Sequence, residues 1–138
     1  MAGTTSAMPD LDLILQSLEA LAEREGDPAP VIYARLFADH PDLEALFLMD
    51  TDGGVRGSML QQSFDCLIDM AEGGIMAPVI LGAERVNHGT YGVPDNLFDA
   101  FFTTIRDCVR DAMGPDWTAE TEAAWSRLLA RTAALADA

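Results

Sequence analysis

The chain has 138 residues, enough for one domain, and its apolar residues form no run near the roughly 18 residues that cross a membrane. Its formal net charge is −15, from 23 acidic residues against 8 basic ones, so long-range repulsion disfavours nucleic acid and anionic membrane surfaces as partners. The two cysteines, Cys66 and Cys108, lie in apolar helical stretches without CxxC or Cys/His spacing. We therefore expect a soluble cytoplasmic protein with an acidic surface and buried free thiols.

Apolar residues recur at helical spacing along the chain, and no segment keeps the alternation of a strand, so the expected class is all-α. Residues 1–9 have neither the basic region nor the apolar core of a secretory signal, and we expect a disordered tail there before a single domain over residues 10–138. Glycine and proline residues divide this domain into six to eight helices. In chain order the helices begin near Asp10, Pro30, Pro41, Val55, Pro78, Asp95 and Thr118, and four of them end at Gly26, Gly73, His88 and Gly114.

His88, one of only two histidines, is the candidate metal ligand. It ends an apolar helical run just before a glycine-containing turn, where one ring nitrogen can face a metal while the other bonds a backbone carbonyl of its own helix. On these residues alone the alternative is a capping histidine, because a cation near a helix C-terminus is mildly favourable. The other histidine, His40, precedes Pro41, a position that favours a helix-end residue over a ligand.

Two stretches of the sequence resemble bacterial haemoglobins and flavohaemoglobins. The segment from Tyr33 to Phe47, YARLFADHPDLEALF, resembles the second-helix-to-corner segment of those proteins. His88, followed after three residues by Gly92 and Val93, resembles their proximal-histidine segment. The match covers the larger part of the chain and is hardest to place in the middle, between Phe47 and the fifth predicted helix.

The resemblance implies a globin-like fold around one b-type haem, held noncovalently since the chain has no CxxCH attachment site. It makes His88 the proximal iron ligand, Phe47 the aromatic residue packed on the porphyrin, and Tyr33 a distal hydroxyl that faces the bound gas. The physical chemistry agrees, because a neutral imidazole binds iron and an apolar pocket retains the porphyrin. For Tyr33 and Phe47 the alternatives are a core tyrosine bonded to a backbone carbonyl and an ordinary core aromatic. The remaining predicted haem contacts are Met59, Leu60, Gln62, Ser63, Arg85, Val93 and Phe98.

The distal helix can be aligned in two registers. Flavohaemoglobins usually carry a distal glutamine, and Gln62 takes that place only if Gly73 and Gly74 lie inside the helix, at roughly 1 kcal/mol per glycine relative to alanine. The other register ends the helix at the glycines, puts Met59 over the iron and places Ser63 one turn further on. We favour Met59, with Gln62 at the pocket rim and able to swing in.

Two departures from the family pattern bear on chemistry. Flavohaemoglobins support the proximal histidine with a tyrosine and a glutamate, but Phe98 stands at the place of the tyrosine and the chain ends before the glutamate. We therefore expect His88 to rest on backbone alone and to donate little electron density to the iron. The chain also has no flavin or nicotinamide domain, so reduction by the family's route would need a separate reductase.

Three functions remain open at this point. The one we favour is a globin that reversibly binds dioxygen or another diatomic gas, such as nitric oxide or carbon monoxide, with Tyr33 as hydrogen-bond donor. The second is a nitric oxide dioxygenase that works with an external reductase. The third is a haem-free interaction or sensory module of globin fold, which the joint presence of His88, Tyr33 and Phe47 disfavours.

Overall fold

The structure, a computed structural model, describes residues 9–90, 92–93 and 95–135, without the side chain at position 95. Over these residues the chain folds into helices and forms no strand, which confirms the predicted all-α class, and their packing is consistent with a globin-like fold. The predicted tail over residues 1–9 lies outside the described residues except for its last position. In chain order the elements are α1 (Asp10–Glu25), α2 (Ala29–Asp39), the 3-10 helix η2 (Pro41–Phe47), α3 (Gly54–Ala71), α4 (Met76–Thr90), α5 (Asp95–Met113), the 3-10 helix η3 (Gly114–Asp116) and α6 (Ala119–Ala134).

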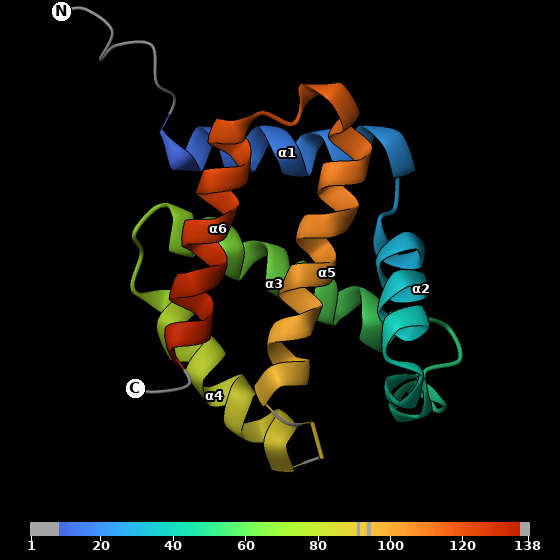
Figure 1. Cartoon of the computed structure of the whole chain (residues 1–138). Helices are drawn as coiled ribbons and strands as arrows, with labels where there is room; N and C mark the ends of the chain where they lie inside the picture. The colour runs from blue at the N-terminus through green and yellow to red at the C-terminus, as the bar shows by residue number, and fades with distance from the viewer. Residues whose placement is uncertain (1–8, 91, 94, 136–138) are drawn as a thin grey trace, which may run out of the picture.

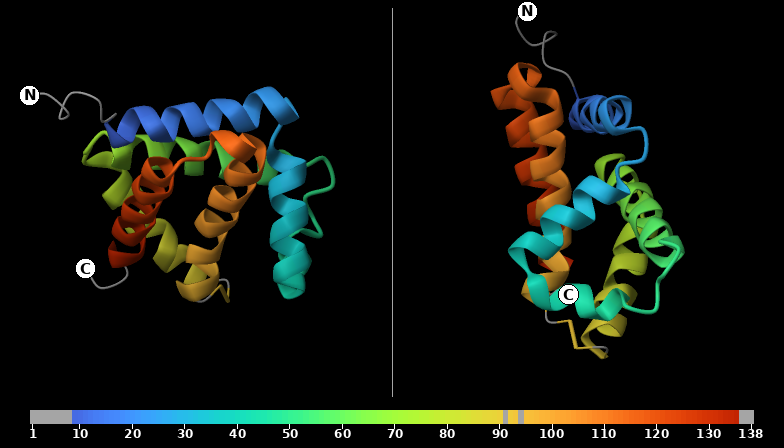
Figure 2. Two further views of the ribbon diagram at one scale, coloured as in Figure 1. Left: turned by 45° about the horizontal axis from the view of Figure 1, so that its top comes forward. Right: turned by 90° about the vertical axis from the view of Figure 1, so that its right-hand side faces the viewer.

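The helices are arranged in two layers. Helices α5 and α6 lie side by side in one layer, and α3 and α4 form the other, as the right-hand view of Figure 2 shows. Helix α1 lies across one end of both layers, and α2 closes one side (Figure 1). Across the described ranges, no helix is both long enough and apolar enough to cross a membrane.

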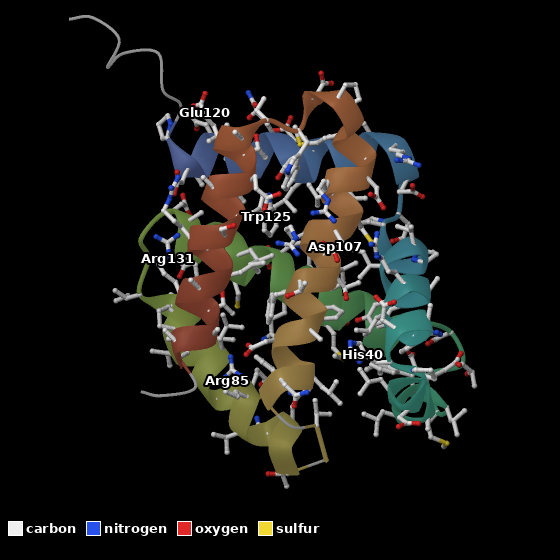
Figure 3. The ribbon with its side chains drawn as sticks, in the orientation of Figure 1. His40, Arg85, Asp107, Glu120, Trp125 and Arg131 are labelled. Carbon is white, nitrogen blue, oxygen red and sulfur yellow. The ribbon has the colours of Figure 1, made fainter. Side chains whose placement is uncertain are left out.

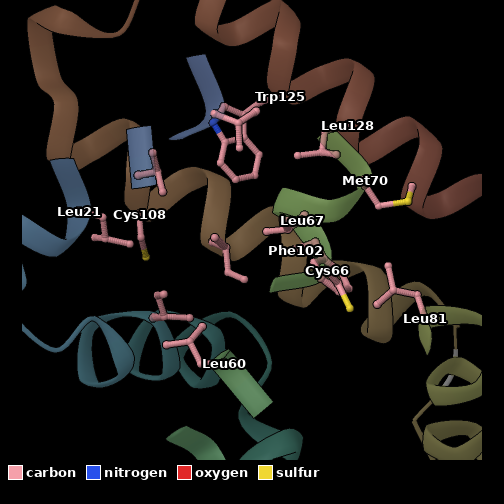
Figure 4. Close-up of a cluster of buried hydrophobic side chains, with 14 of the residues drawn as sticks. Leu21, Leu60, Cys66, Leu67, Met70, Leu81, Phe102, Cys108, Trp125 and Leu128 are labelled. Atoms are coloured by element: carbon pink, nitrogen blue, oxygen red, sulfur yellow. The ribbon is translucent and has the colours of Figure 1, made fainter. Parts of the chain in front are cut away.

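The main core lies where α1, α3, α5 and α6 meet. Trp125 of α6 is fully buried there, with Leu128 and Leu67 beside it (Figure 4). Its indole N–H donates to the Ser17 hydroxyl of α1 at 2.9 Å, and that hydroxyl donates to the Ile14 carbonyl at 2.7 Å. The buried polar atoms of this contact are therefore satisfied, as a buried tryptophan requires.

Both cysteines are buried free thiols, as the sequence predicts. Cys66 belongs to α3 and Cys108 to α5, and Figure 4 shows both within the apolar core. Burial raises the pKa of each thiol above its ordinary value, because a thiolate loses its hydration in the apolar interior. Both thiols therefore stay protonated and unreactive at neutral pH.

The junction between α3 and α4 explains the glycine pair that ends α3. Gly73 has a φ of 77°, which is the left-handed conformation that favours glycine, and a Cβ at Gly74 would collide with the Asp69 carboxylate. That carboxylate turns toward α4 and accepts a hydrogen bond from the Ala77 N–H at 2.7 Å. The prediction that this helix ends at the glycine pair is confirmed.

Two predicted helix boundaries differ from the structure. Helix α4 begins two residues before Pro78, because the Asp69 carboxylate satisfies one of its free N-terminal N–H groups, and it continues past His88 to Thr90. The short helix that Pro41 opens is a 3-10 helix, a form common in short connectors. Neither difference moves the residues that face the interior.

Candidate functional site

An apolar cavity lies among α2, η2, α3, α4 and the first turns of α5. It holds about 700 Å³ of empty space, counting its open mouth. Aliphatic and aromatic side chains make up most of its wall. The lining residues are Tyr33, Leu36, Leu43, Leu46, Phe47, Met59, Gln62, Ser63, Leu81, Glu84, His88, Val93, Leu97, Phe98, Phe101 and Phe102.

His88 lines this cavity from the last turn of α4, with 27% of its side chain exposed. Its Nδ1 lies 2.7 Å from the Glu84 carbonyl oxygen of the preceding turn. A carbonyl can only accept, so this bond requires a proton on Nδ1, and in the neutral ring the lone pair then lies on Nε2. The predicted bond between one ring nitrogen and a carbonyl of its own helix is confirmed, and Nε2 has the electronic form of a metal ligand.

The Glu84 carboxylate also lies near His88, which the sequence-based expectation of backbone support alone did not include. Its Oε2 is 3.8 Å from Nδ1 of His88, and its Oε1 accepts a long hydrogen bond from the Asn87 amide at 3.5 Å. The spacing of four residues on one helix was the available signal for this pair. Phe98 packs edge-on against the His88 ring, with ring centres 5.2 Å apart.

Arg85 does not line the cavity, contrary to the prediction that it contacts a cofactor. It is 6% exposed, and its Nη2 donates to Asp99 of α5 at 2.6 Å and to the Thr132 carbonyl of α6 at 3.1 Å. Its guanidinium lies 4.7 Å from the centre of the Phe98 ring. A buried guanidinium needs a carboxylate and further acceptors, and α5 and α6 supply them, so Arg85 ties three helices together where α4 approaches α6 (Figure 3).

Tyr33 lines the opposite part of the cavity from α2 and is buried, with 3% exposed. Its ring packs against Phe37, Phe47 and Phe101 with centres 5.5 to 5.8 Å apart. Its hydroxyl donates to the Arg56 carbonyl at 2.9 Å, which is the core-tyrosine alternative that the sequence left open. Burial raises the pKa of Tyr33 above its ordinary value, so the phenol keeps its proton and remains a donor.

A buried carboxylate in the loop before α3, that of Asp50, holds Arg56, whose carbonyl is the partner of Tyr33. Asp50 accepts hydrogen bonds from the backbone N–H groups of Val55 and Arg56 at 3.0 and 2.9 Å and from Nε of Arg56 at 3.0 Å. Burial raises the pKa of Asp50, but these bonds outweigh it and leave the pKa below its ordinary value. The sequence suggested only a turn-forming loop here, because Asp50 lies four residues before the first residue of α3 and not at the N-cap position.

The three predicted distal residues all line the cavity from α3. Met59 and Ser63 lie one turn apart, and the Ser63 hydroxyl donates to the Met59 carbonyl at 2.8 Å. Gln62 lines the same cavity and also borders a groove between α3 and α4, so it lies at the rim. Leu60, predicted as a further contact, points into the core instead, with 3% exposed. Phe47, Val93 and Phe98 line the cavity as expected, whereas His40 does not.

Several lining residues were not among the predicted contacts, because the sequence marks them only as apolar helix positions. Leu36, Leu43, Leu81, Leu97 and Phe101 could not be told from ordinary core residues by spacing. Compared with known proteins, the chain matches no family model and no curated protein. Its residues and its fold therefore carry the functional argument.

Proposed function

We propose that the chain is a haem-binding globin that reversibly binds a diatomic gas, with dioxygen as the first candidate. One observation carries the proposal: His88 keeps its proton on Nδ1 through the Glu84 carbonyl and lines an apolar, aromatic cavity with a free Nε2. Tyr33 and Phe47 line the same cavity, as the resemblance to bacterial globins implies.

The donor set favours a haem over a bare metal ion. A bare ion needs several protein ligands, whereas a haem iron takes four nitrogens from the porphyrin and needs one imidazole from the protein. The cavity wall offers one imidazole and is otherwise largely hydrocarbon, which suits a flat apolar ring. Cys66 and Cys108 are absent from the wall, which supports noncovalent attachment. When bound, the haem would supply an iron with an open position for the gas.

The residues of the chain would then have separate tasks. His88 would bind the haem iron, and its Nδ1 bond to the Glu84 carbonyl fixes the orientation of the ring. Phe47, Phe98 and the aliphatic wall exclude water, which keeps gas binding reversible. Tyr33 holds a proton that can be donated to a polar gas. The buried thiols support a reducing compartment such as the cytoplasm, where a separate reductase would keep the iron ferrous.

The absorption spectrum of the purified protein tests this proposal. The protein is measured as isolated, after reduction and with carbon monoxide, and the haem-free protein is titrated with hemin. We expect one hemin per chain and the spectrum of a histidine-ligated b-type haem that shifts with carbon monoxide. Failure to take up hemin would favour the haem-free module. Steady consumption of nitric oxide, with dioxygen and a reductase supplied, would favour the dioxygenase over simple gas binding.

A further inference from the structure

The wall of the apolar cavity carries no lysine or arginine. Among the described residues that line it, the ionisable ones are Tyr33, Glu84 and His88, and with a neutral histidine only Glu84 carries a formal charge at neutral pH. All eight basic residues of the chain are arginines, and all eight lie within the described ranges. The wall therefore offers one carboxylate and no arginine to a bound group.

Seven of the eight arginines form ion pairs with carboxylates that lie outside the cavity. Arg56 and Arg85 belong to helices that line the cavity, but Asp50 and Asp99 bind their guanidinium groups. The eighth, Arg131, is exposed on α6. A guanidinium of these pairs could turn to the cavity only by leaving its carboxylate. The pairs are Arg24–Glu25, Arg35–Asp111, Arg56–Asp50, Arg85–Asp99, Arg106–Asp107, Arg110–Asp107 and Arg127–Asp10.

A haem would bring two negative charges to this cavity. Its two carboxylic acid groups lie on one edge of the ring and are ionised at neutral pH, as simple carboxylic acids are. An unpaired carboxylate is costly in an apolar interior, so this edge must face the open mouth. At the rim of the cavity, exposed Gln62 offers a neutral amide. The net charge of −15 repels the haem carboxylates over a longer range.

We propose that this site holds a haem by its iron and its apolar faces alone, without ion pairs to the two carboxylates, so that the haem exchanges readily with other haem-binding molecules. The inference rests on the proposed function and defines which parts of the haem are recognised. His88 would bind the iron, and the aromatic and aliphatic wall would pack on the ring. An iron porphyrin whose carboxylates are esterified should therefore bind as well as haem itself.

Titration of the haem-free protein with hemin and with hemin dimethyl ester tests this recognition, at about 20 mM and about 500 mM sodium chloride. We expect hemin to bind no tighter than the ester at low salt. Its affinity should rise with salt, which screens the repulsion, while that of the ester stays constant. Binding of hemin tenfold tighter than the ester, with an affinity that falls as salt rises, would overturn this inference alone. Failure of both compounds to bind would overturn the proposed haem site itself.

Two neighbouring glutamines allow a matched test of the missing ion pair. Gln62 lines the cavity, whereas Gln61 borders only the groove between α3 and α4 and its amide donates to Asp65 at 3.1 Å. Transfer of haem to an excess of haem-free myoglobin measures the release rate. Gln62→Arg should slow release by about two- to fivefold, the value of an exposed ion pair, and Gln61→Arg, with the same change in net charge, should leave it nearly unchanged. Equal release from both variants would overturn the inference, because carboxylates that are already paired gain nothing from a cation at the rim.

Discussion

The two sides of the cavity are prepared for a ligand to different degrees. On the His88 side, the hydrogen bond that orients the ring runs to Glu84, one turn earlier on the same helix. On the Tyr33 side, the hydroxyl is already bonded to the Arg56 carbonyl, 23 residues away in sequence. The His88 ring is thus already held in one orientation by its own helix. The Tyr33 side must break one bond before it can stabilise a gas, and that bond is worth about 1 kcal/mol.

Replacing His88 is expected to have the largest effect and to test the prepared side. In His88→Ala the cavity keeps its apolar wall but loses its one imidazole, so we expect haem to be lost or held only weakly. Hemin titration followed by gel filtration measures this directly. His40→Ala serves as control, because His40 caps α2 and does not line the cavity. Equal retention and an unchanged spectrum in His88→Ala would mean that another group binds the iron.

Replacing Tyr33 tests whether the second side rearranges. If the phenol leaves the Arg56 carbonyl and donates to bound dioxygen, Tyr33→Phe should speed dioxygen release by about one to two decades, the value of a charge-assisted hydrogen bond. Carbon monoxide, which is less polar, should respond far less. Flash photolysis and stopped-flow mixing give both rates.

The same variant also reports on the resting bond. Loss of the bond to Arg56 should lower the free energy of unfolding of the haem-free protein by about 1 kcal/mol. A lower stability together with a dioxygen release rate within twofold of the parent would show that Tyr33 stays with Arg56 and has no distal role. Urea unfolding is a suitable measurement.

The contrast between the two sides also explains how far the sequence could predict this site. The bond of His88 is local to one helix, and the end of α3 at Gly73 depends on a φ that glycine favours, so both could be inferred from spacing and residue type. The bond of Tyr33 to Arg56 joins two helices, and no periodicity reports such a contact. Local geometry was predictable here, and long-range pairing was not.

The partners of Arg85 are a second example of long-range pairing that the sequence could not predict. A buried cation must find acceptors, but the sequence does not show which ones. Its partners, Asp99 and the Thr132 carbonyl, lie 14 and 47 residues away and belong to two other helices. The resemblance to globins suggested the cavity instead. A resemblance to known sequences could not predict this ion pair, because its two partners lie on other helices far along the chain.

Asp50 holds Arg56, the partner of Tyr33, and removing its charge should change how the thermal stability of the protein depends on pH. The folded pKa of Asp50 is lowered, so its ionised form stabilises the fold above the unfolded pKa of about 3.9, and this stabilisation is lost as pH falls through the folded value. Asp50→Asn should therefore unfold at a lower temperature than the parent near neutral pH. The difference should narrow below about pH 4. Thermal unfolding followed by circular dichroism measures it, and a gap unchanged in acid would assign the effect to shape instead of charge.

Removing the charge of Glu84 tests the electrostatic interaction between its carboxylate and the His88 ring. A carboxylate 3.8 Å from Nδ1 makes the imidazole a better electron donor, although partial exposure of both groups reduces the effect. Glu84→Gln should raise the midpoint potential of the bound haem by tens of millivolts and lower the iron–histidine stretching frequency. Glu72→Gln makes the same charge change at an exposed position before α4. Equal shifts of the midpoint potential in both variants would mean that net charge, and not the contact with His88, causes the change.

Replacing Met59 tests the role of its side chain on the Tyr33 side of the cavity. Among these variants we expect it to change gas binding least. Its thioether lines the cavity together with Gln62 and Ser63, so it can act as an apolar lid or bind the iron as a sixth ligand. We favour the lid, because Tyr33 already lies on this side and a permanent sixth ligand would oppose gas binding. Met59→Leu keeps volume and polarity nearly constant, so gas rates should change by less than about tenfold and the unliganded ferrous spectrum should stay high-spin. A low-spin spectrum of the parent that disappears in Met59→Leu would instead identify sulfur as a ligand. If only Gln62→Leu changed the rates, the distal role would belong to Gln62 at the cavity rim.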